Sequence, residues 1–533
     1  MPRNLFALTL AGVIVALSVL LMPSDASRIS EPAAWVGAPF ELLWGLALLC
    51  VLPRKAARRA SVAMAVLLVV LLAWKLADIV ARTAYWRTFD PLADWRLLAS
   101  GWNVLTQSIG TGWSLGVLGA LILLLVAVGW LSAAGLYLAS RLGQRNRLRT
   151  AALWGGVGAV CLGGGVIDQE IGERSASRFV AEHVELSRHN LEALASLKIE
   201  LGKDALASMP SNRLMTQIKG QDVLLLFIES YGRSALDAPE YSGVVRARLE
   251  AIERSLGSAG YEAYSGWLES PTVGGQSWLA HATLLSGLWI DSQRRYEWLV
   301  ESPRLTLNRL FQRGGWRTVA AMPANTRPWD EASFFGYDTV YDASNLGYEG
   351  KPFNWVTMPD QFTLWSLYQR ELAVTRSQPV MIEAALISSH APWTPIPTLK
   401  AWDHLDQGRA FDQEADSGDP PRVVWQDPDR VRRQYLKSID YTLKTLGSFV
   451  TEFQKTRPIV VAVGDHQPAS IITGSEATRQ VPMHIMAPTG NSMLLLAKRW
   501  GWTQGMIPEA RLLPMTMAAV RDRLVMGLQP PGR

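Results

Sequence analysis

The sequence predicts two parts: an N-terminal all-α membrane domain of five helices and a C-terminal α/β domain with a mostly parallel sheet. Three observations lead to this fold class. Apolar residues of the 533-residue chain are concentrated in five long stretches of its first third. The remainder alternates strand-like and helical segments, as in a parallel sheet covered by helices. Two short apolar runs there, Val223–Ile228 and Ile459–Val463, are followed at once by polar residues.

The five apolar stretches each have about the length that crosses a bilayer. They are Leu5–Met22, Ala34–Leu52, Ser61–Ala81, Trp113–Leu138 and Ala151–Ile167. Basic clusters follow the second and the fourth, so the positive-inside rule places Arg54–Arg59, Arg141–Arg149 and the N-terminus in the cytoplasm. An odd number of spans then places everything after Ile167 outside. Alternatively, the first stretch is a signal peptide that is cleaved at Ser24-Asp25-Ala26. Cleavage would leave the C-terminal domain on the same, outer side of the membrane.

The net charge and the positions of the cysteines limit the possible binding partners and disulfide bonds. The net charge of +5 is accounted for by the two cytoplasmic clusters, so no nucleic acid is expected. Cys50 and Cys161 lie inside predicted spans, which leaves the outer part without a disulfide framework. Lys75 and Asp78 stand one helical turn apart near the outer end of the third span. We interpret them as a snorkelling lysine with its partner, or else as a lipid-headgroup contact.

Three segments follow from this reading. Residues 1–168 are the five-span domain, and residues 169–220 are linker helices, since apolar residues from Phe179 to Leu194 recur at helical spacing. Residues 221–533 form the extracytoplasmic α/β domain. Its expected strands are Val223–Ile228, Thr318–Met322, Val380–Ile387 and Ile459–Val463. Its expected helices are Val244–Ala259, Leu305–Arg313 and Val431–Phe453, with an insertion loop at Lys400–Pro428.

Metal-binding residue types follow two of these strands. Glu229 comes directly after the first, and Asp465 and His466 follow Gly464 after the last. Because parallel strands present their carboxyl ends at one edge of a sheet, we expect the three side chains to meet there. Two carboxylates and an imidazole suit one divalent metal ion, manganese or zinc.

A candidate nucleophile stands at a glycine turn. Gly274-Gly275-Gln276-Ser277 precedes a helical run, and backbone N–H groups at a helix start favour an anion. A metal-activated Ser277 hydroxyl could attack a phosphoryl group there. The alternative is a plain glycine turn capped by serine. Ser270 and Thr272 are rival hydroxyls nearby.

Taken in order, these motifs resemble the alkaline phosphatase superfamily. They are Glu229-Ser230, the Ser277 turn with its helix ending Leu-Leu-Ser-Gly287, Ser389-His390-Ala391-Pro392-Trp393 and Gly464-Asp465-His466. The stretch Gly336–Asp342 and the helix from Tyr435 add to the likeness. The chain is similar to the sulfatase-like membrane branch that contains lipoteichoic acid synthases and phosphoethanolamine transferases. The likeness covers about Asp222–Pro488.

The resemblance assigns roles by position. It implies metal ligation by Glu229, Ser277, Asp465 and His466, with Ser277 as nucleophile in place of the threonine of that branch. It implies that His390 contacts the phosphoryl group or the leaving oxygen. It also implies a substrate-binding region that here contains Arg327, Trp329, Glu331, Trp393 and His484, with His484 weighed equally as a core histidine.

The sequence departs from its relatives in three places. No arginine follows Ser277 in the manner of formylglycine sulfatases, and the outer domain lacks the disulfides of phosphoethanolamine transferases. Met322 and Glu331 stand where lipoteichoic acid synthases have a histidine and an arginine near Trp329.

The expected function is transfer of a phospho-alcohol group, of phosphoglycerol or phosphoethanolamine type. The donor is a phospholipid, and the acceptor is a glycan or lipid in the cell envelope or periplasm. The expected location is the bacterial cytoplasmic (inner) membrane, multi-pass, with the catalytic domain outside. A membrane-tethered phosphodiesterase or sulfatase-like hydrolase is the first alternative. An inactive membrane scaffold is the second.

Overall fold

The computed structural model describes residues 3–24, 28–35, 37, 39–85, 87–95, 101–102, 105–106, 110–143, 146–167, 175–453, 456–474 and 477–530. The chain divides into two compact units, Met1–Ala195 and Ser196–Arg533. Asp25, Ala26, Arg145 and Asp168, which enter the predictions above, lie outside the described residues.

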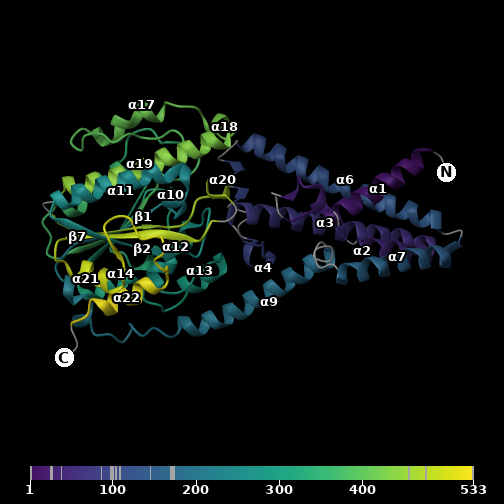
Figure 1. Cartoon of the computed structure of the whole chain (residues 1–533), viewed down its shortest axis with the longest axis horizontal. Helices are drawn as coiled ribbons and strands as arrows, with labels where there is room; N and C mark the ends of the chain where they lie inside the picture. The colour runs from purple at the N-terminus through teal and green to yellow at the C-terminus, as the bar shows by residue number, and fades with distance from the viewer. Residues whose placement is uncertain are drawn as a thin grey trace. The chain divides into compact units, whose positions relative to one another are not determined.

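The N-terminal unit is helical (Figure 1). Its helices are α1 (Arg3–Leu21), α2 (Phe40–Val51), α3 (Arg54–Tyr85), α4 (Pro91–Asp94), α6 (Thr111–Gly143), α7 (Arg147–Ile167) and the start of α9 (Ala176–Leu201). Three of them are long and apolar enough to cross a membrane, over Asn4–Leu21, Arg54–Tyr85 and Thr111–Leu142. The 12-residue α2 rises only about 18 Å against a hydrocarbon core of about 30 Å. The count of five spans therefore stays a prediction.

Helix α1 packs closely on α6. A Cβ atom added to Gly12 would lie 2.6 Å from the Cα of Gly135, so the two backbones meet where neither residue has a side chain. Small residues at such crossings are typical of membrane helix pairs.

Lys75 and Asp78 are both buried, but they are not partners of each other. The Lys75 ammonium donates to the carbonyls of Leu20 and Met22, each at 2.8 Å, at the C-terminal end of α1. Asp78 accepts from Arg82 at 2.7 Å and lies 3.5 Å from His183 of α9. The expected snorkelling pair is wrong, because Lys75 binds carbonyls at the end of α1 and Asp78 binds Arg82 of its own helix.

The C-terminal unit is built on one nine-stranded sheet in the order β4-β3-β5-β1-β6-β7-β2-β8, with β9 also paired to β2. The strands are β1 (Val223–Ile228), β2 (Tyr261–Glu269), β3 (Arg317–Met322), β4 (Thr339–Asp342), β5 (Val380–Leu386), β6 (Ile459–Gly464), β7 (Gln480–Pro488), β8 (Thr503–Gln504) and β9 (Met515–Thr516). From β4 to β6 all neighbours are parallel, whereas β7 is antiparallel to β6 and β2. The sheet is therefore mixed, which corrects the expectation of a mostly parallel one.

Helices cover both faces of this sheet (Figure 1). Their bounds are α10 (Ser234–Asp237), α11 (Pro239–Ser258), α12 (Ser277–Ser286), α13 (Gln293–Val300), α14 (Leu307–Gly314), α15 (Ala332–Phe335), α16 (Asp360–Leu367), α17 (Asp412–Ala415), α18 (Pro421–Val424), α19 (Pro428–Glu452), α20 (Ser470–Thr473), α21 (Ser492–Arg499) and α22 (Ala519–Gly527). Alternate residues of β1 supply the two cores: Leu224 and Leu226 face the core shared with α11 and α19. Leu225 and Phe227 face the core shared with α12, α14 and α22.

The register of the central strands positions the site. Ile228 at the end of β1 pairs with Gly464 at the end of β6. Glu229 and Asp465, the next residues of the two strands, therefore emerge side by side at the carboxyl edge of the parallel half. The four strands expected from the sequence all form, within one residue of their predicted ends.

Candidate functional site

Glu229, Asp465 and His466 converge at this edge, with ligand atoms that all lie within 4.8 Å of one another. The Nε2 atom of His466 is 3.4 Å from Glu229 and 3.5 Å from Asp465. The Ser277 hydroxyl completes the group, since its Oγ lies 3.0 Å from Glu229 Oε2 and 3.2 Å from His466 Nε2. Four donors around a zinc-sized ion, each about 2.0–2.2 Å from it, stand about 3.3–3.6 Å apart. The spacing of this donor set therefore fits one metal ion.

The electrostatics of the group also favour a cation. All three ionisable residues are buried. Burial raises the pKa of Glu229, but His390 and His466 outweigh burial and bring that pKa down to about 2. Burial and the adjacent Glu229 raise the pKa of Asp465 well above its usual range, and the charge of His281 acts in the opposite direction. A divalent ion between the carboxylates relieves their mutual repulsion.

The turn before Ser277 needs its glycines. Gly274 and Gly275 have φ of +71° and +147°, and Gln276 takes the left-handed conformation at φ +63° just before α12 begins. The Gly274 N–H donates at 2.8 Å to the carbonyl of Gln467, the residue after His466. The turn that presents the serine is thus tied to the segment that presents the histidine.

Gly464 is required by a close approach of two chain segments. A Cβ atom at this position would lie 1.9 Å from the carbonyl oxygen of Tyr231, two residues after Glu229. The loops that carry Glu229 and Asp465 can approach one another only because Gly464 has no side chain. The Ser230 N–H, at a left-handed φ of +56°, donates to Asp465 Oδ1 at 2.8 Å and locks this approach.

The two rival hydroxyls have other partners. Ser270 is fully buried and donates to the Asp465 carbonyl at 2.6 Å. Thr272 donates to the carbonyl of Gly275 at 2.7 Å. Both support the site from outside the donor set, whereas the Ser277 hydroxyl lies within it.

His390 follows β5 on a loop that is bound to the segment containing Glu229, just after β1. The neighbouring Ser389 hydroxyl donates to the Glu229 carbonyl at 2.6 Å. The His390 ring lies parallel to the indole of Trp355, with centroids 6.3 Å apart. The loop thus presents His390 beside Glu229 with a half-buried aromatic wall, Trp355, that the sequence reading did not identify.

The five predicted substrate-binding residues differ in their burial. Arg327 and Glu331 are exposed, and half-buried Trp329 packs 5.8 Å from the ring of Tyr337. Trp393 and His484 lie in the core instead. The Trp393 indole donates to the Ser389 carbonyl at 2.7 Å, so it supports the His390 loop.

His484 is fully buried, with one ring nitrogen 3.1 Å from Tyr231 and the other 2.7 Å from Ser265. Burial lowers the pKa of His484 to about 3. It is a neutral core histidine with no free nitrogen for a substrate.

His281 is a histidine near the site that was not among the residues predicted from the sequence. It lies on α12 one turn after Ser277, and its Nδ1 is 2.9 Å from Glu383 Oε1. Glu383 is a fully buried carboxylate on β5 that also accepts from Asn308 at 3.2 Å and from Tyr337. A lone acid inside the apolar strand Val380–Leu386 is the sequence signal that could have found this pair.

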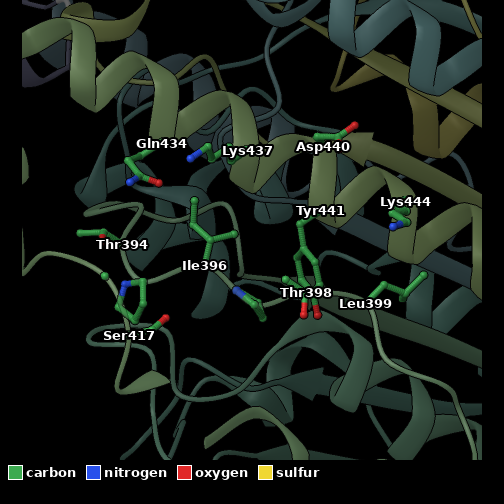
Figure 2. A pocket seen from close by; sticks show the side chains of 13 residues that line it. Thr394, Ile396, Thr398, Leu399, Ser417, Gln434, Lys437, Asp440, Tyr441 and Lys444 are labelled. Carbon is green, nitrogen blue, oxygen red and sulfur yellow. The ribbon is translucent and has the colours of Figure 1, made fainter. Parts of the chain in front are cut away.

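A groove of about 370 Å³ runs along α19 (Figure 2). The segment that follows His390, Thr394–Leu399, forms one wall, and Gln434, Lys437, Asp440, Tyr441 and Lys444 of α19 form the other. Asp440 is neutralised by Arg248 at 2.7 Å, and the exposed ammonium groups of Lys437 and Lys444 form no ion pair with any described residue. The groove is therefore electropositive.

Comparison with known proteins identifies the fold of the C-terminal unit. The family model described as Sulfatase matches residues 221–496. The comparison with curated proteins found no similar sequence.

Several solved structures are similar. A phosphoglycerol transferase from Streptococcus pyogenes, GacH, has a TM-score of 0.37 and 15% identity over 56% of this chain and 76% of its own. The periplasmic domain of EcEptC from Escherichia coli has a TM-score of 0.37 and 12% identity, over 57% of this chain and 80% of its own. The lipoteichoic acid synthase LtaP from Listeria monocytogenes has a TM-score of 0.34 and 13% identity over 50% of this chain. The match spans only 65% of the LtaP chain.

The family match covers just over half of the 533 residues and includes Glu229, Ser277, His390, Asp465 and His466. It confirms the resemblance drawn from the ordered motifs: this chain belongs to the sulfatase family.

Proposed function

We propose that this protein is a membrane-anchored, metal-dependent transferase that moves a phospho-alcohol group from a phospholipid to a glycan or lipid acceptor outside the cytoplasm. The observation that carries the proposal is the position of the Ser277 hydroxyl, 3.0 Å from Glu229 and 3.2 Å from His466. A hydroxyl inside a metal-binding donor set is suited to nucleophilic attack on a phosphorus or sulfur ester.

Glu229, Asp465, His466 and Ser277 would hold one divalent ion, manganese or zinc. When bound, the ion lowers the pKa of the serine hydroxyl and stabilises charge on the phosphoryl oxygens. The backbone N–H groups at the start of the ten-residue helix α12 lie beside Ser277 and favour an anion at the same place.

In the first displacement, the Ser277 hydroxyl loses its proton to bulk water, and its Oγ forms a bond to the phosphorus of the phospholipid headgroup. The bond from phosphorus to the diacylglycerol oxygen breaks, and that oxygen takes up a proton to leave as diacylglycerol. We assign delivery of this proton to His390, whose charge acts directly on Glu229. The product on the protein is a diester of Ser277 and the phospho-alcohol.

In the second displacement, an acceptor hydroxyl attacks the same phosphorus and loses its proton to His390. The Ser277 oxygen departs and regains its proton from bulk water, while His390 holds the acceptor's proton, so the protein returns to its starting state. The groove along α19 shares the segment after His390 and carries two ammonium groups, which suits an acceptor that bears negative charge.

A phosphoester fits this site better than formylglycine-dependent sulfate chemistry. Ser277 is followed by Trp-Leu-Ala-His, with no arginine in the position that the formylglycine motif needs. The apolar N-terminal helices favour a lipid donor, because they confine the chain to the membrane that contains it. We place the chain in the bacterial cytoplasmic membrane, with the C-terminal unit outside.

The test uses the purified full chain in proteoliposomes that contain headgroup-labelled phosphatidylglycerol or phosphatidylethanolamine. We expect diacylglycerol release from one donor and a labelled phospho-alcohol on the peptide that contains Ser277. Ser255→Ala, at an exposed serine of α11, is the matched control for Ser277→Ala.

Three results would contradict parts of the proposal. Release of free phospho-alcohol regardless of any acceptor would make the protein a phosphodiesterase. Turnover of sulfate esters alone would make it a sulfatase-like hydrolase. Absence of any turnover, with metal bound, would favour an inactive scaffold.

A further inference from the structure

His281 and Glu383 form a pair that is not part of the proposed metal-ligand set but lies near it. His281 is the fourth residue after Ser277 on α12, so it lies on the same side of the helix, about 6 Å further along the axis. Its ring stacks on Phe227, with centroids 3.7 Å apart and an interplanar angle of 16°. Phe227 precedes Glu229 by two residues, so the ring lies one strand repeat, roughly 7 Å, before the edge where the ligands converge.

Glu383 needs a positive partner. Its side chain is fully buried, and a carboxylate in such a place is costly unless it is paired. Of its hydrogen-bond partners among the described residues, Asn308 and Tyr337 are neutral, and His281 is the one that can carry positive charge. His281 is therefore the partner that can offset the charge of Glu383, and a paired carboxylate costs less than a lone buried one.

The pair leaves one ring nitrogen for the site. Nδ1 is directed to Glu383, and one ring face is covered by Phe227. No hydrogen bond to Nε2 is made by any described residue, and 11% of the His281 side chain remains exposed. The donor set of Glu229, Asp465 and His466 does not include His281. Its Nε2 is thus available to a ligand.

We propose that His281 is a further substrate-contacting residue, whose Nε2–H donates to an oxygen of the tetrahedral oxyanion held at Ser277, and that Glu383 is its positioning residue. The inference rests on the proposed function only in placing a phosphoryl or sulfuryl group at Ser277. Glu383 fixes the ring edge that faces the site, and Tyr337 connects the carboxylate to Trp329 of the predicted substrate wall.

The experiment measures binding of orthovanadate, a tetrahedral oxyanion, to the metal-loaded full chain in detergent by titration calorimetry. Loss of one charge-assisted hydrogen bond in His281→Gln should weaken binding roughly 10- to 100-fold. Glu383→Gln should weaken it by about tenfold, because the ring then loses its orientation. His404→Gln, at a histidine whose side chain is 78% exposed, is the control and should bind as the unaltered chain does.

The double variant separates positioning from a merely structural role. If Glu383 acts through His281, the double variant binds vanadate no more weakly than His281→Gln alone. Independent losses that multiply would overturn the positioning role. Metal content and the thermal midpoint are measured on the same samples, and loss of metal in His281→Gln would make the residue a ligand and overturn the contact.

The outcome is distinguishable from that of the proposed function. Vanadate binding that depends on His281, in a protein that transfers no phospho-alcohol, would refute the transferase and keep the contact. Lipid turnover with unchanged vanadate binding in His281→Gln would refute the contact and keep the transferase. Absence of vanadate binding to the unaltered metal-loaded chain would also overturn the contact.

Discussion

The Ser277 hydroxyl lies 3.0 Å from Glu229 Oε2, although the two residues are 48 positions apart and follow different elements. Glu229 reaches this point from the end of a buried parallel strand, and Ser277 from a turn that Gly274 and Gly275 make possible. Ser277 is half-buried, whereas the other three residues of the donor set are buried. Substitutions at Ser277 and at the buried ligands should therefore have different consequences.

Ser277→Ala should abolish turnover while the chain remains folded, because it removes the attacking oxygen and little packing. Ser277→Thr should keep part of the activity, since it retains the hydroxyl and adds one methyl group at a half-buried position. Diacylglycerol release and the mass of the Ser277 peptide are the measurements. Turnover in Ser277→Ala, with no adduct on any peptide, would indicate direct attack by water.

The purified chain should contain about one manganese or zinc ion, because the donors described here form a single coordination sphere. Asp465→Ala and His466→Ala should each lose the ion and all activity, as measured by elemental mass spectrometry. His404→Ala, at an exposed histidine, serves as the control. Two tightly bound ions per chain would contradict the single site and point to a two-metal hydrolase.

Gly464→Ala should disrupt the site by steric conflict. The added Cβ would meet the Tyr231 carbonyl at 1.9 Å, so the loops after β1 and β6 must separate. We expect a loss of about 1–3 kcal/mol in stability, together with weaker metal binding. Gly243→Ala in α11 is the matched control: its Cβ meets nothing within 4 Å, and alanine should stabilise the helix by about 0.5–1 kcal/mol. Equal metal affinity in Gly464→Ala and the unaltered chain would contradict the close-approach requirement.

The sequence predicted β1, β3, β5 and β6, and the meeting of Glu229, Asp465 and His466, because both depend on local patterns. A short apolar run followed by Glu229 or Asp465 indicates a buried strand and the polar edge at its end. The antiparallel strands β2 and β7 were missed, since Gly266 and Pro482 weaken the strand pattern and their pairing joins segments more than 200 residues apart. The partner of Lys75 and the core position of Trp393 could not be predicted either, because both depend on packing between distant segments.

Asp360 should make stability depend on pH. Burial raises the pKa of Asp360 to about 6, against the opposing hydrogen bonds from Thr442 and Ser388. An unfolded aspartate titrates near 3.9, so between about pH 4 and 6 the folded chain binds more protons than the unfolded chain. The free energy of unfolding therefore falls as the pH rises through this window.

Asp360→Asn should remove this dependence, which amounts to at most about 3 kcal/mol. The stability of the variant minus that of the unaltered chain should be larger at pH 7 than at pH 4. The thermal midpoint of both proteins at each pH measures this difference. Asp403→Asn removes an exposed carboxylate and serves as the control. A difference between variant and unaltered chain that stays constant from pH 4 to 7 would contradict a raised pKa at Asp360.

Fusions of a reporter that is active only outside the cytoplasm should settle the number of spans. With five spans, a fusion after Arg58 is inactive, and fusions after Asp94 and after Arg533 are active. If only α1, α3 and α6 cross, and the N-terminus is still inside, the Arg58 fusion becomes active and the Asp94 fusion inactive, while the Arg533 fusion stays active. The basic residues at Arg54–Arg59 favour the first pattern, although α2 alone is short. Its neighbouring segments must then complete the crossing. An inactive Arg533 fusion would contradict both arrangements and would remove the extracytoplasmic location from the proposed function.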